Sequence, residues 1–238
     1  MPYALAGHVF VCREGEHVVF LDVRKDRYFA LEAAQTSGLG QVVPGWPVAG
    51  AQGGPSHESA PHVEGPTHSA VLALLLERGL LCEHPAVGKD ATPATPVAPG
   101  GELTADSLDG SSRLNAKVVG QFIASAATAS FVLKYHRLER VLRRVARRNG
   151  ASSPGRRSPW PGAERALELV AAFASLRPFF FTSKDACLFE ALALSEFLAR
   201  HEIFPRWVFG VQARPFAAHC WLQQGDLVLN DTVEHVSL

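Results

Sequence analysis

The chain has 238 residues, of which 47% are hydrophobic and 19% are charged. This composition excludes a disordered chain and leaves room for one large domain or two small ones. Lysine plus arginine and aspartate plus glutamate number 23 each, so no overall positive charge favours a nucleic-acid partner.

The cysteines and the apolar segments limit the cellular setting. The four cysteines form no CxxC pair, which argues against a disulfide framework or a zinc site and favours a reducing compartment; they are Cys12, Cys82, Cys187 and Cys220. The N-terminal residues lack the basic start and apolar run of a signal peptide, and no apolar stretch is long enough to span a bilayer. We therefore expect a cytoplasmic protein.

Short strands are predicted in the first third. The runs HVFVC and HVVFLDV flank turn residues and predict a hairpin over 8–23, and RYFAL predicts a strand over 27–31. Residues 40–66 are dense in glycine and proline, which predicts a long loop or an insertion. Its histidines have no acid or thiol at ligand spacing, so no metal site is predicted there. A short amphipathic helix is predicted over 67–79.

A linker and a second domain follow. The composition of 86–112 is that of a linker, which divides the chain into domains at 1–85 and 113–238. Helices are predicted first in the second domain and antiparallel strands after them, so we expect an α+β fold. One or two helices are predicted over 114–148, further helices over 158–176 and 184–200, and the strands over 205–212, 215–224 and 226–231.

An arginine-rich segment lies within the first of these helices. Residues 134–148 hold six arginines on a repeating apolar frame. A solvated basic face is the simplest interpretation. The alternatives are a docking surface for an acidic partner and a contact with a membrane surface.

Cys187 stands at the start of the predicted helix 184–200. Thr182 and Ser183 are good capping residues, and Asp185 falls in the first turn. The partial positive charge of a helix N-terminus favours thiolate over thiol. The alternative is a cysteine that packs as a small buried apolar side chain.

His219 and Asp231 are predicted to meet across the last hairpin. With Gln224-Gly225-Asp226 as a three-residue loop, the two residues lie equally far from Gly225 and face each other directly. A carboxylate beside an imidazole fixes its tautomer and leaves the other ring nitrogen for a nucleophile. Together with Cys187, these residues predict a Cys-His-Asp triad.

Four residues close to the predicted triad in the sequence are not assigned to it. Cys220 and Asn230 alternate to the opposite strand face, so we expect Cys220 to pack in the core. Glu234 and His235 form a possible second acid–base pair, but they lie near the chain end, where fraying is common.

The segments CLFEALAL, FGVQARPFAAHCWLQQGD and LND resemble, in this order and spacing, the B proteins of lasso peptide maturation. These are leader peptidases with a transglutaminase-like, papain-like cysteine protease fold. The resemblance covers 112–238 and implies Cys187 as nucleophile, His219 as general base and acid, and Asp231 as orienting carboxylate. VVFLDVRKDRYFAL is similar to the RiPP recognition element, a small winged-helix-like domain.

The resemblance implies a function and partners. The protein would bind the leader of a ribosomally made lasso precursor peptide and cut it off, without a cofactor. An ATP-dependent, asparagine-synthetase-like lasso cyclase would then use the freed amine. The leader would add as a strand along 27–31, with the helix 67–79 as the other wall. The residues expected to bind it are Arg27, Tyr28, Phe29, Leu31, Leu72 and Leu75.

Two other functions remain open. A transglutaminase-like acyl transferase or amidase would use the same triad with an amine in place of water. A non-catalytic peptide-binding adaptor would need only the N-terminal domain, and the complete triad argues against it.

Overall fold

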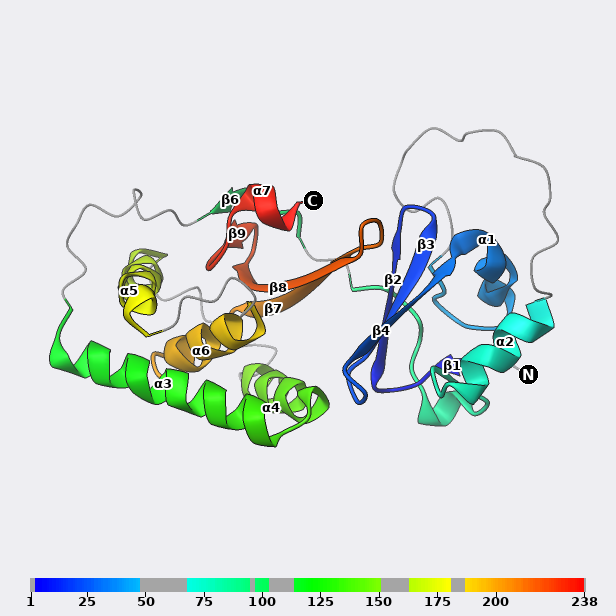
Figure 1. Ribbon diagram of the computed structural model, residues 1–238, viewed down its shortest axis with the longest axis horizontal. Coiled ribbons are helices and arrows are strands. Elements are labelled where there is room, and N and C mark those ends of the chain that lie inside the picture. The colour runs from blue at the N-terminus through cyan, green and yellow to red at the C-terminus, as the bar shows by residue number, and fades with distance from the viewer. Residues whose placement is uncertain are drawn as a thin grey trace. The chain divides into compact units, whose positions relative to one another are not determined.

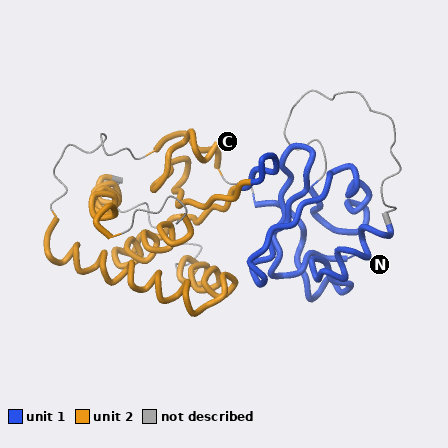
Figure 2. Tube along the Cα trace, viewed as in Figure 1, with its two compact units in different colours: residues 1–95, 211–216 blue, residues 96–210, 217–238 orange. Residues whose placement is uncertain are grey.

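The chain forms two compact units in the computed structural model (Figures 1 and 2). Unit 1 comprises Met1–Thr95 and Val211–Phe216, and unit 2 comprises Pro96–Gly210 and Ala217–Leu238. The structure describes residues 3–47, 68–94, 97–102, 114–150, 163–180 and 187–237. Unit 1 contains a three-stranded sheet, and unit 2 contains helices followed by a sheet, so the predicted α+β class is confirmed.

An antiparallel meander forms the centre of unit 1. Its strands pair in sequence order and are β2 (Val9–Glu14), β3 (His17–Asp22) and β4 (Arg27–Glu32). The predicted hairpin is present: Glu14 pairs with His17 across a tight turn, in which Gly15 has a φ of +53°. Strand β3 is buried along most of its length, whereas β4 is partly exposed and forms an edge of this sheet.

Helix α2 (His68–Glu77) completes the core of unit 1. Leu75 of α2 and Phe20 of β3 are both fully buried in one apolar cluster. The helix stops before Gly79, whose φ of +70° suits a residue without a Cβ. The smaller elements are β1 (Ala4–Leu5), α1 (Ala33–Thr36), η1 (Ser37–Gln41), β5 (Leu81–Cys82) and η2 (Pro85–Val87).

The loop predicted over 40–66 is present in residues 42–47, which form neither helix nor strand, after Gly40 and Gln41 at the end of η1. Val43 and Trp46 are buried in the unit 1 core, and the Trp46 ring lies 5.8 Å from that of Phe20. Burial of these apolar side chains therefore fixes a segment that its proline and glycine content assigned to a loop. Residues 48–67 lie outside the described part of the chain.

Unit 2 is built around a buried helix. Helix α6 is buried continuously from Ala191 to Leu198 and packs against α3, α5 and β8 (Figure 1). Of the one or two helices predicted over 114–148, the structure forms two, because His136 adopts extended backbone angles that end the first. The helical elements are α3 (Ala116–Tyr135), α4 (Leu138–Gly150), α5 (Ala163–Leu176), η4 (Arg177–Phe179) and α6 (Cys187–Ala199).

Among the helices of the described residues, only α3 is long and apolar enough to span a membrane. A core helix can have the same composition, and one side of α3 is in the core. Phe122 is fully buried, and its ring lies 5.0 Å from that of Phe173 in α5. The helix is therefore buried in part.

A four-stranded sheet lies beside these helices. Its strands pair in the order β6 (Gly101–Glu102), β9 (Leu227–Val228), β8 (Ala217–Gln224) and β7 (Arg206–Gln212), with β6 parallel to β9. The short helix α7 (Val233–Val236) follows the sheet. These strands bring the C-terminal residues next to the start of α6, because α6 packs directly on β8.

The segment predicted as a linker contributes to both units. Ala91 is fully buried in the unit 1 core, whereas Gly101 and Glu102 pair with β9 in unit 2. The Gln223 side chain also donates a hydrogen bond to the carbonyl of Val97. The boundary between the units falls between residues 95 and 96, inside the predicted linker 86–112.

Candidate active site

Cys187 is the first residue of α6 and is partly exposed. The first N–H groups of a helix have no partner within it, so the start of α6 places partial positive charge beside the sulfur. The predicted capping residues Thr182 and Ser183, and also Asp185, lie outside the described residues. The buried residues Ala191–Leu198 hold α6 in the core and thereby fix the position of its first turn.

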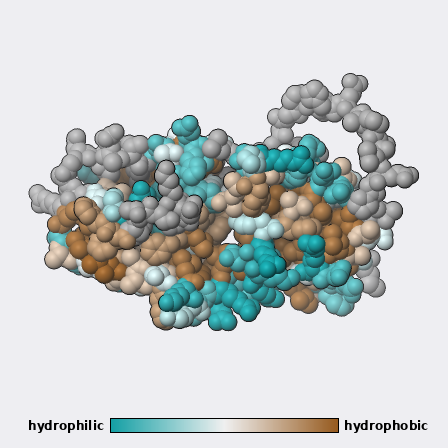
Figure 3. Space-filling model, viewed as in Figure 1, coloured by the Kyte–Doolittle hydropathy of each residue, from teal (hydrophilic) through white to brown (hydrophobic). Residues whose placement is uncertain are grey.

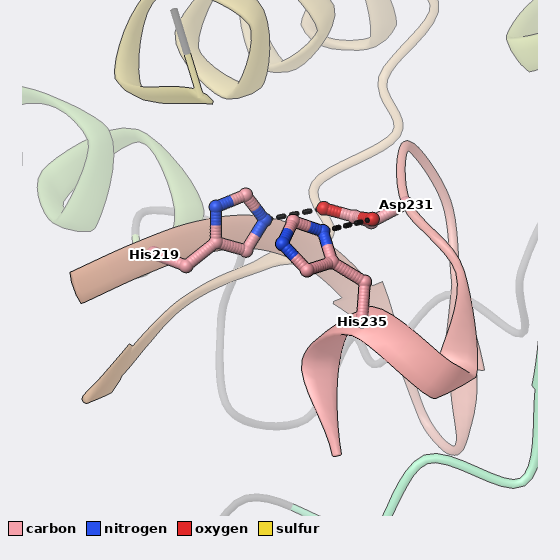
Figure 4. A group of neighbouring side chains, drawn as sticks. All are labelled: His219, Asp231 and His235. Atoms are coloured by element: carbon pink, nitrogen blue, oxygen red, sulfur yellow. Dashed lines mark hydrogen bonds and ion pairs between the residues drawn. The ribbon is translucent and has the colours of Figure 1, made fainter. Parts of the chain in front are cut away.

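His219 lies on β8 between Cys187 and Asp231. Its Nε2 donates a short hydrogen bond to Oδ2 of Asp231 (Figure 4). The imidazole also makes a hydrogen bond with the thiol of Cys187. Because Nε2 is used by Asp231, Nδ1 is the ring nitrogen left for the sulfur. The structure thus brings together all three residues of the predicted triad.

The predicted register of the last hairpin is wrong by one residue. Gln224 pairs with Leu227 and Gln223 with Val228, so the turn contains two residues, Gly225 and Asp226, and not three. Gly225 has a φ of +62°, as such a tight turn requires.

Asp231 reaches His219 because the chain leaves the ladder. The backbone pairing ends with Leu229, whose N–H donates to the carbonyl of Leu222. The Asn230 side chain then accepts a hydrogen bond from the N–H of Leu222 and replaces the next backbone partner. Asp231 is therefore free of the alternation that would turn it away from His219.

His235 belongs to the site, although its place near the chain end predicted fraying. Its Nδ1 donates to Oδ1 of Asp231 at 2.9 Å, and its ring centroid lies 4.5 Å from that of His219 (Figure 4). The Thr232 side chain caps the N-terminus of α7 by accepting from the N–H of His235. The expectation that the chain frays at His235 is wrong, because this cap and the contact with Asp231 hold His235 in place.

The thiol and imidazole form an ion pair at neutral pH. Hydrogen bonds from the Cys220 thiol and from His219 lower the pKa of Cys187 to about 4, although partial burial acts in the opposite direction. Hydrogen bonds to Asp231 and to Cys187 raise the pKa of His219 to about 9. Between these values Cys187 is a thiolate and His219 an imidazolium, which is the reactive form of a cysteine nucleophile.

Asp231 stays ionised in this arrangement. Burial alone would raise its pKa, but hydrogen bonds from His219, His235 and the N–H of Thr232 lower it to about 2. A permanently charged carboxylate stabilises the imidazolium and holds the ring in one orientation.

Cys220 packs in the core as predicted, and it also contacts the site. It is 2% exposed within the unit 2 core cluster, and its thiol makes a hydrogen bond with Cys187. This contact and burial raise the pKa of Cys220, so Cys220 remains a neutral S–H donor beside the Cys187 thiolate. Strict strand alternation predicted the burial and missed the contact, because α6 covers this part of β8.

A second ion pair lies close to the nucleophile. Glu190 is one helical turn after Cys187 on α6 and accepts a hydrogen bond from Arg177 at 2.7 Å. Burial raises the pKa of Glu190, and the negative charges of Asp231 and Cys187 add to this effect. This ion pair was not predicted from the sequence, although a carboxylate three residues after the nucleophile was a usable signal.

The residues predicted to bind a leader peptide all lie in unit 1. Four of them are on the edge strand β4, where Arg27 is exposed and Tyr28, Phe29 and Leu31 are partly buried. On α2, Leu72 is partly buried, whereas Leu75 is fully buried and offers no surface to a peptide. The Phe29 ring contacts Phe20 of the core and lies under the guanidinium of Arg78.

Among the described residues, His219, Asp231 and His235 are a group whose ligand atoms are close enough to hold a metal ion. Nε2 of His219 and Nδ1 of His235 already donate to the two oxygens of Asp231. A metal on these atoms would displace both protons and remove the contact that orients His219. These three side chains therefore already satisfy one another through two hydrogen bonds.

Comparison with known proteins agrees with this geometry. Residues 129–237 match the family described as the transglutaminase-like superfamily, and the matched region includes Cys187, His219 and Asp231. No curated protein and no solved structure gave a significant match. Residues 129–237 therefore form a transglutaminase-like domain, whose fold is one used by cysteine proteases and acyltransferases.

Proposed function

We propose that the protein is a cysteine endopeptidase that removes the leader peptide from a lasso precursor peptide. One observation supports the chemistry above all: Asp231 binds Nε2 of His219, so that Nδ1 is left for the Cys187 thiolate. The choice of a lasso precursor as substrate rests on the resemblance of the segments around these three residues to the lasso B proteins.

The proposed reaction begins with attack of the Cys187 sulfur on the carbonyl carbon of the last leader residue. The peptide C–N bond breaks, and the imidazolium of His219 gives its proton to the departing amine of the core peptide. Neutral His219 then takes a proton from water, whose oxygen attacks the thioester and releases the leader acid. Asp231 keeps the ring oriented through both steps.

The developing oxyanion needs hydrogen-bond donors. The N–H of Cys187 is a candidate, because it belongs to the first turn of α6 and has no partner within the helix. Such a donor stabilises the tetrahedral intermediate most when it is already positioned, as at the start of a buried helix.

Recognition of the leader is assigned to unit 1. Strand β4 is an edge of its sheet, and an extended peptide can pair with the free main-chain groups of an edge strand. Tyr28, Phe29 and Leu31 are partly exposed there and would contact leader side chains, with Arg27 at the start of the strand. Leu72 of α2 remains in the proposal, but buried Leu75 does not.

The product chemistry points to a partner. Cleavage frees the α-amine of the core peptide, and a lasso ring closes when that amine joins an acidic side chain. An ATP-dependent lasso cyclase of the asparagine-synthetase type would supply this step. No cofactor is assigned to the protease itself.

The test uses the full chain and a synthetic precursor peptide that contains leader and core. We expect mass spectrometry to find two fragments whose masses add up to the precursor plus one water. The Cys187→Ala variant should bind the peptide without cutting it, because only the sulfur is removed. Failure of the wild-type chain to cut any lasso precursor would reject the proposed substrate.

The same experiment separates the two alternative functions. An acyl transferase would yield a leader amide when an amine is added, and little free leader acid. A non-catalytic adaptor would bind the precursor and leave it intact, with the same result for the wild type and for Cys187→Ala.

A further inference from the structure

Helix α3 has an apolar stripe on its solvent-exposed side. Residues at helical spacing of three or four form this α3 stripe, which consists of Gly120, Ile123, Ala127, Phe131 and Tyr135. The three large side chains are well exposed, with Ile123 at 46%, Phe131 at 58% and Tyr135 at 60%. The rings of Phe131 and Tyr135 contact each other at 4.8 Å. The fold of unit 2 thus leaves this face without an apolar partner among the described residues.

Positive charge exceeds negative charge next to the stripe. Helix α3 contains no acidic residue, and Lys134 and Arg137 flank the aromatic pair. The following helix α4 adds five arginines, which exceed their two acidic partners: Glu139 pairs with Arg143 at 2.6 Å, and Glu196 of α6 pairs with Arg148 at 2.9 Å and with Arg144 at 3.7 Å. Figure 3 shows the hydrophobic surface where Figure 1 places α3, with hydrophilic residues at the α4 end.

We propose that the α3 stripe and the adjoining cations form a docking surface for an anionic lipid membrane. The aromatic pair would enter the region between headgroups and acyl chains, and Lys134, Arg137 and Arg140 would lie among the lipid phosphates. This inference does not depend on the proposed protease function.

The observations favour a membrane over an acidic protein. From Gly120 to Tyr135 the helix offers a convex apolar edge of about 22 Å, which fits a soft planar surface better than a preformed groove. An anionic bilayer supplies negative charge and hydrocarbon together, which matches the two chemistries present here. The attraction acts over about a Debye length, so the other α4 arginines contribute without touching a lipid.

The test is sedimentation of the full chain with vesicles. We expect binding to phosphatidylcholine vesicles that contain phosphatidylglycerol, little binding to phosphatidylcholine alone, and release by high salt. The double variant Arg137→Gln/Arg140→Gln should weaken binding about fivefold for each charge removed. The double variant Phe131→Ser/Tyr135→Ser should weaken it about tenfold or more, because the buried apolar area is lost.

Matched controls remove one exposed apolar and one exposed basic residue elsewhere. Val87→Ser and Arg206→Gln should bind vesicles as the wild type does. Unchanged alkylation of Cys187 in every variant would show that unit 2 is folded. Phe131→Trp keeps the stripe apolar and should give a blue-shifted tryptophan emission with the anionic vesicles.

Two results would overturn the proposal. One is absence of wild-type binding to anionic vesicles, which is also what a surface for an acidic protein would give. The other is an unshifted emission of Phe131→Trp on vesicles that do bind the chain, since the stripe would then lie away from the lipid.

Discussion

The carboxylate of Asp231 binds the imidazole of His219 from outside the β8–β9 ladder. In the observed register, a continued ladder would turn Asp231 to the face opposite His219. The side chain of Asn230 takes over the pairing with Leu222, and the chain is then free to place Asp231 beside the ring. Asn230 is therefore a structural determinant of the candidate site.

Asp231→Asn should keep the fold and lower the rate of peptide cleavage by roughly two to four orders of magnitude. An amide cannot stabilise the imidazolium, so the pKa of His219 should fall from about 9 and the proton needed by the leaving amine should be lost. The measurement is the rate of precursor cleavage, with circular dichroism as the check on folding.

Adding Asn230→Asp to that variant should restore nothing. Residue 230 is held by the N–H of Leu222, so a carboxylate there points away from His219. Substantial recovery of the rate in the double variant would show that the two neighbouring side chains can exchange places.

Cys187 should be the cysteine that iodoacetamide alkylates fastest, ahead of Cys12, Cys82 and Cys220. Its pKa is lowered to about 4, so the reactive thiolate is present at neutral pH and disappears only as the pH falls through about 4. Burial raises the pKa of Cys12 and, together with the hydrogen bond to Cys187, that of Cys220. Mass spectrometry after brief labelling, repeated from pH 3 to 8, gives the profile.

Cys220→Ala should move the acid limb of that profile to higher pH. The thiol of Cys220 is the largest influence that lowers the pKa of Cys187, so its loss leaves less thiolate at a given low pH and slows alkylation there. Cys220→Ser keeps an O–H donor and should behave more like the wild type. Equal profiles for the alanine variant and the wild type would mean that His219 alone maintains the thiolate.

His235→Ala should lower the cleavage rate about tenfold and move the alkaline limb of the pH–rate profile upward. Without the donor on Oδ1, the charge of Asp231 is shared by fewer partners and stabilises the His219 imidazolium more strongly. His235→Asn can place its amide N–H near the former Nδ1 and should restore both the rate and the profile. Indistinguishable alanine and asparagine variants would argue against this hydrogen bond as the cause.

Local sequence signals were sufficient for most of the elements. Short apolar runs beside turn residues predicted β2, β3 and β4, and helical spacing predicted α2 and the helices of unit 2. Local signals did not predict burial that depends on distant segments. Trp46 lies in a stretch rich in proline and glycine, yet Phe20 and other core residues bury it. No local pattern reports that contact.

The candidate site likewise combines residues that local sequence predicts with residues whose position depends on distant contacts. Cys187 at a helix start was visible from spacing, and the contact between His219 and Asp231 was predicted, although from the wrong register. His235 was missed because its position depends on α7, a helix of a single turn that tertiary contacts hold in place. The side chain of Glu102, far away in the sequence, accepts from the first N–H of α7.

Because Glu102 contacts α7, residues before α3 support the candidate site. A chain of residues 96–238 should fold and should alkylate Cys187 as fast as the full chain. A chain of residues 113–238 should alkylate it more slowly, because it lacks β6 and Glu102. Without them β9 loses its parallel neighbour, and α7 loses the acceptor at its N-terminus.

Full-length Glu102→Gln is the matched variant, because it keeps β6 and leaves a weaker acceptor for α7. We expect its alkylation rate to lie between those of the two shortened chains. Equal rates for all of these proteins would show that residues 97–102 do not support the site.

If the leader binds unit 1, the 96–238 chain should also cut dilute precursor poorly. In the full chain the tether supplies an effective concentration on the order of millimolar, so a high precursor concentration should restore the cleavage rate of the shortened chain. Slow cleavage with fast alkylation would therefore place the defect in recognition and not in the nucleophile.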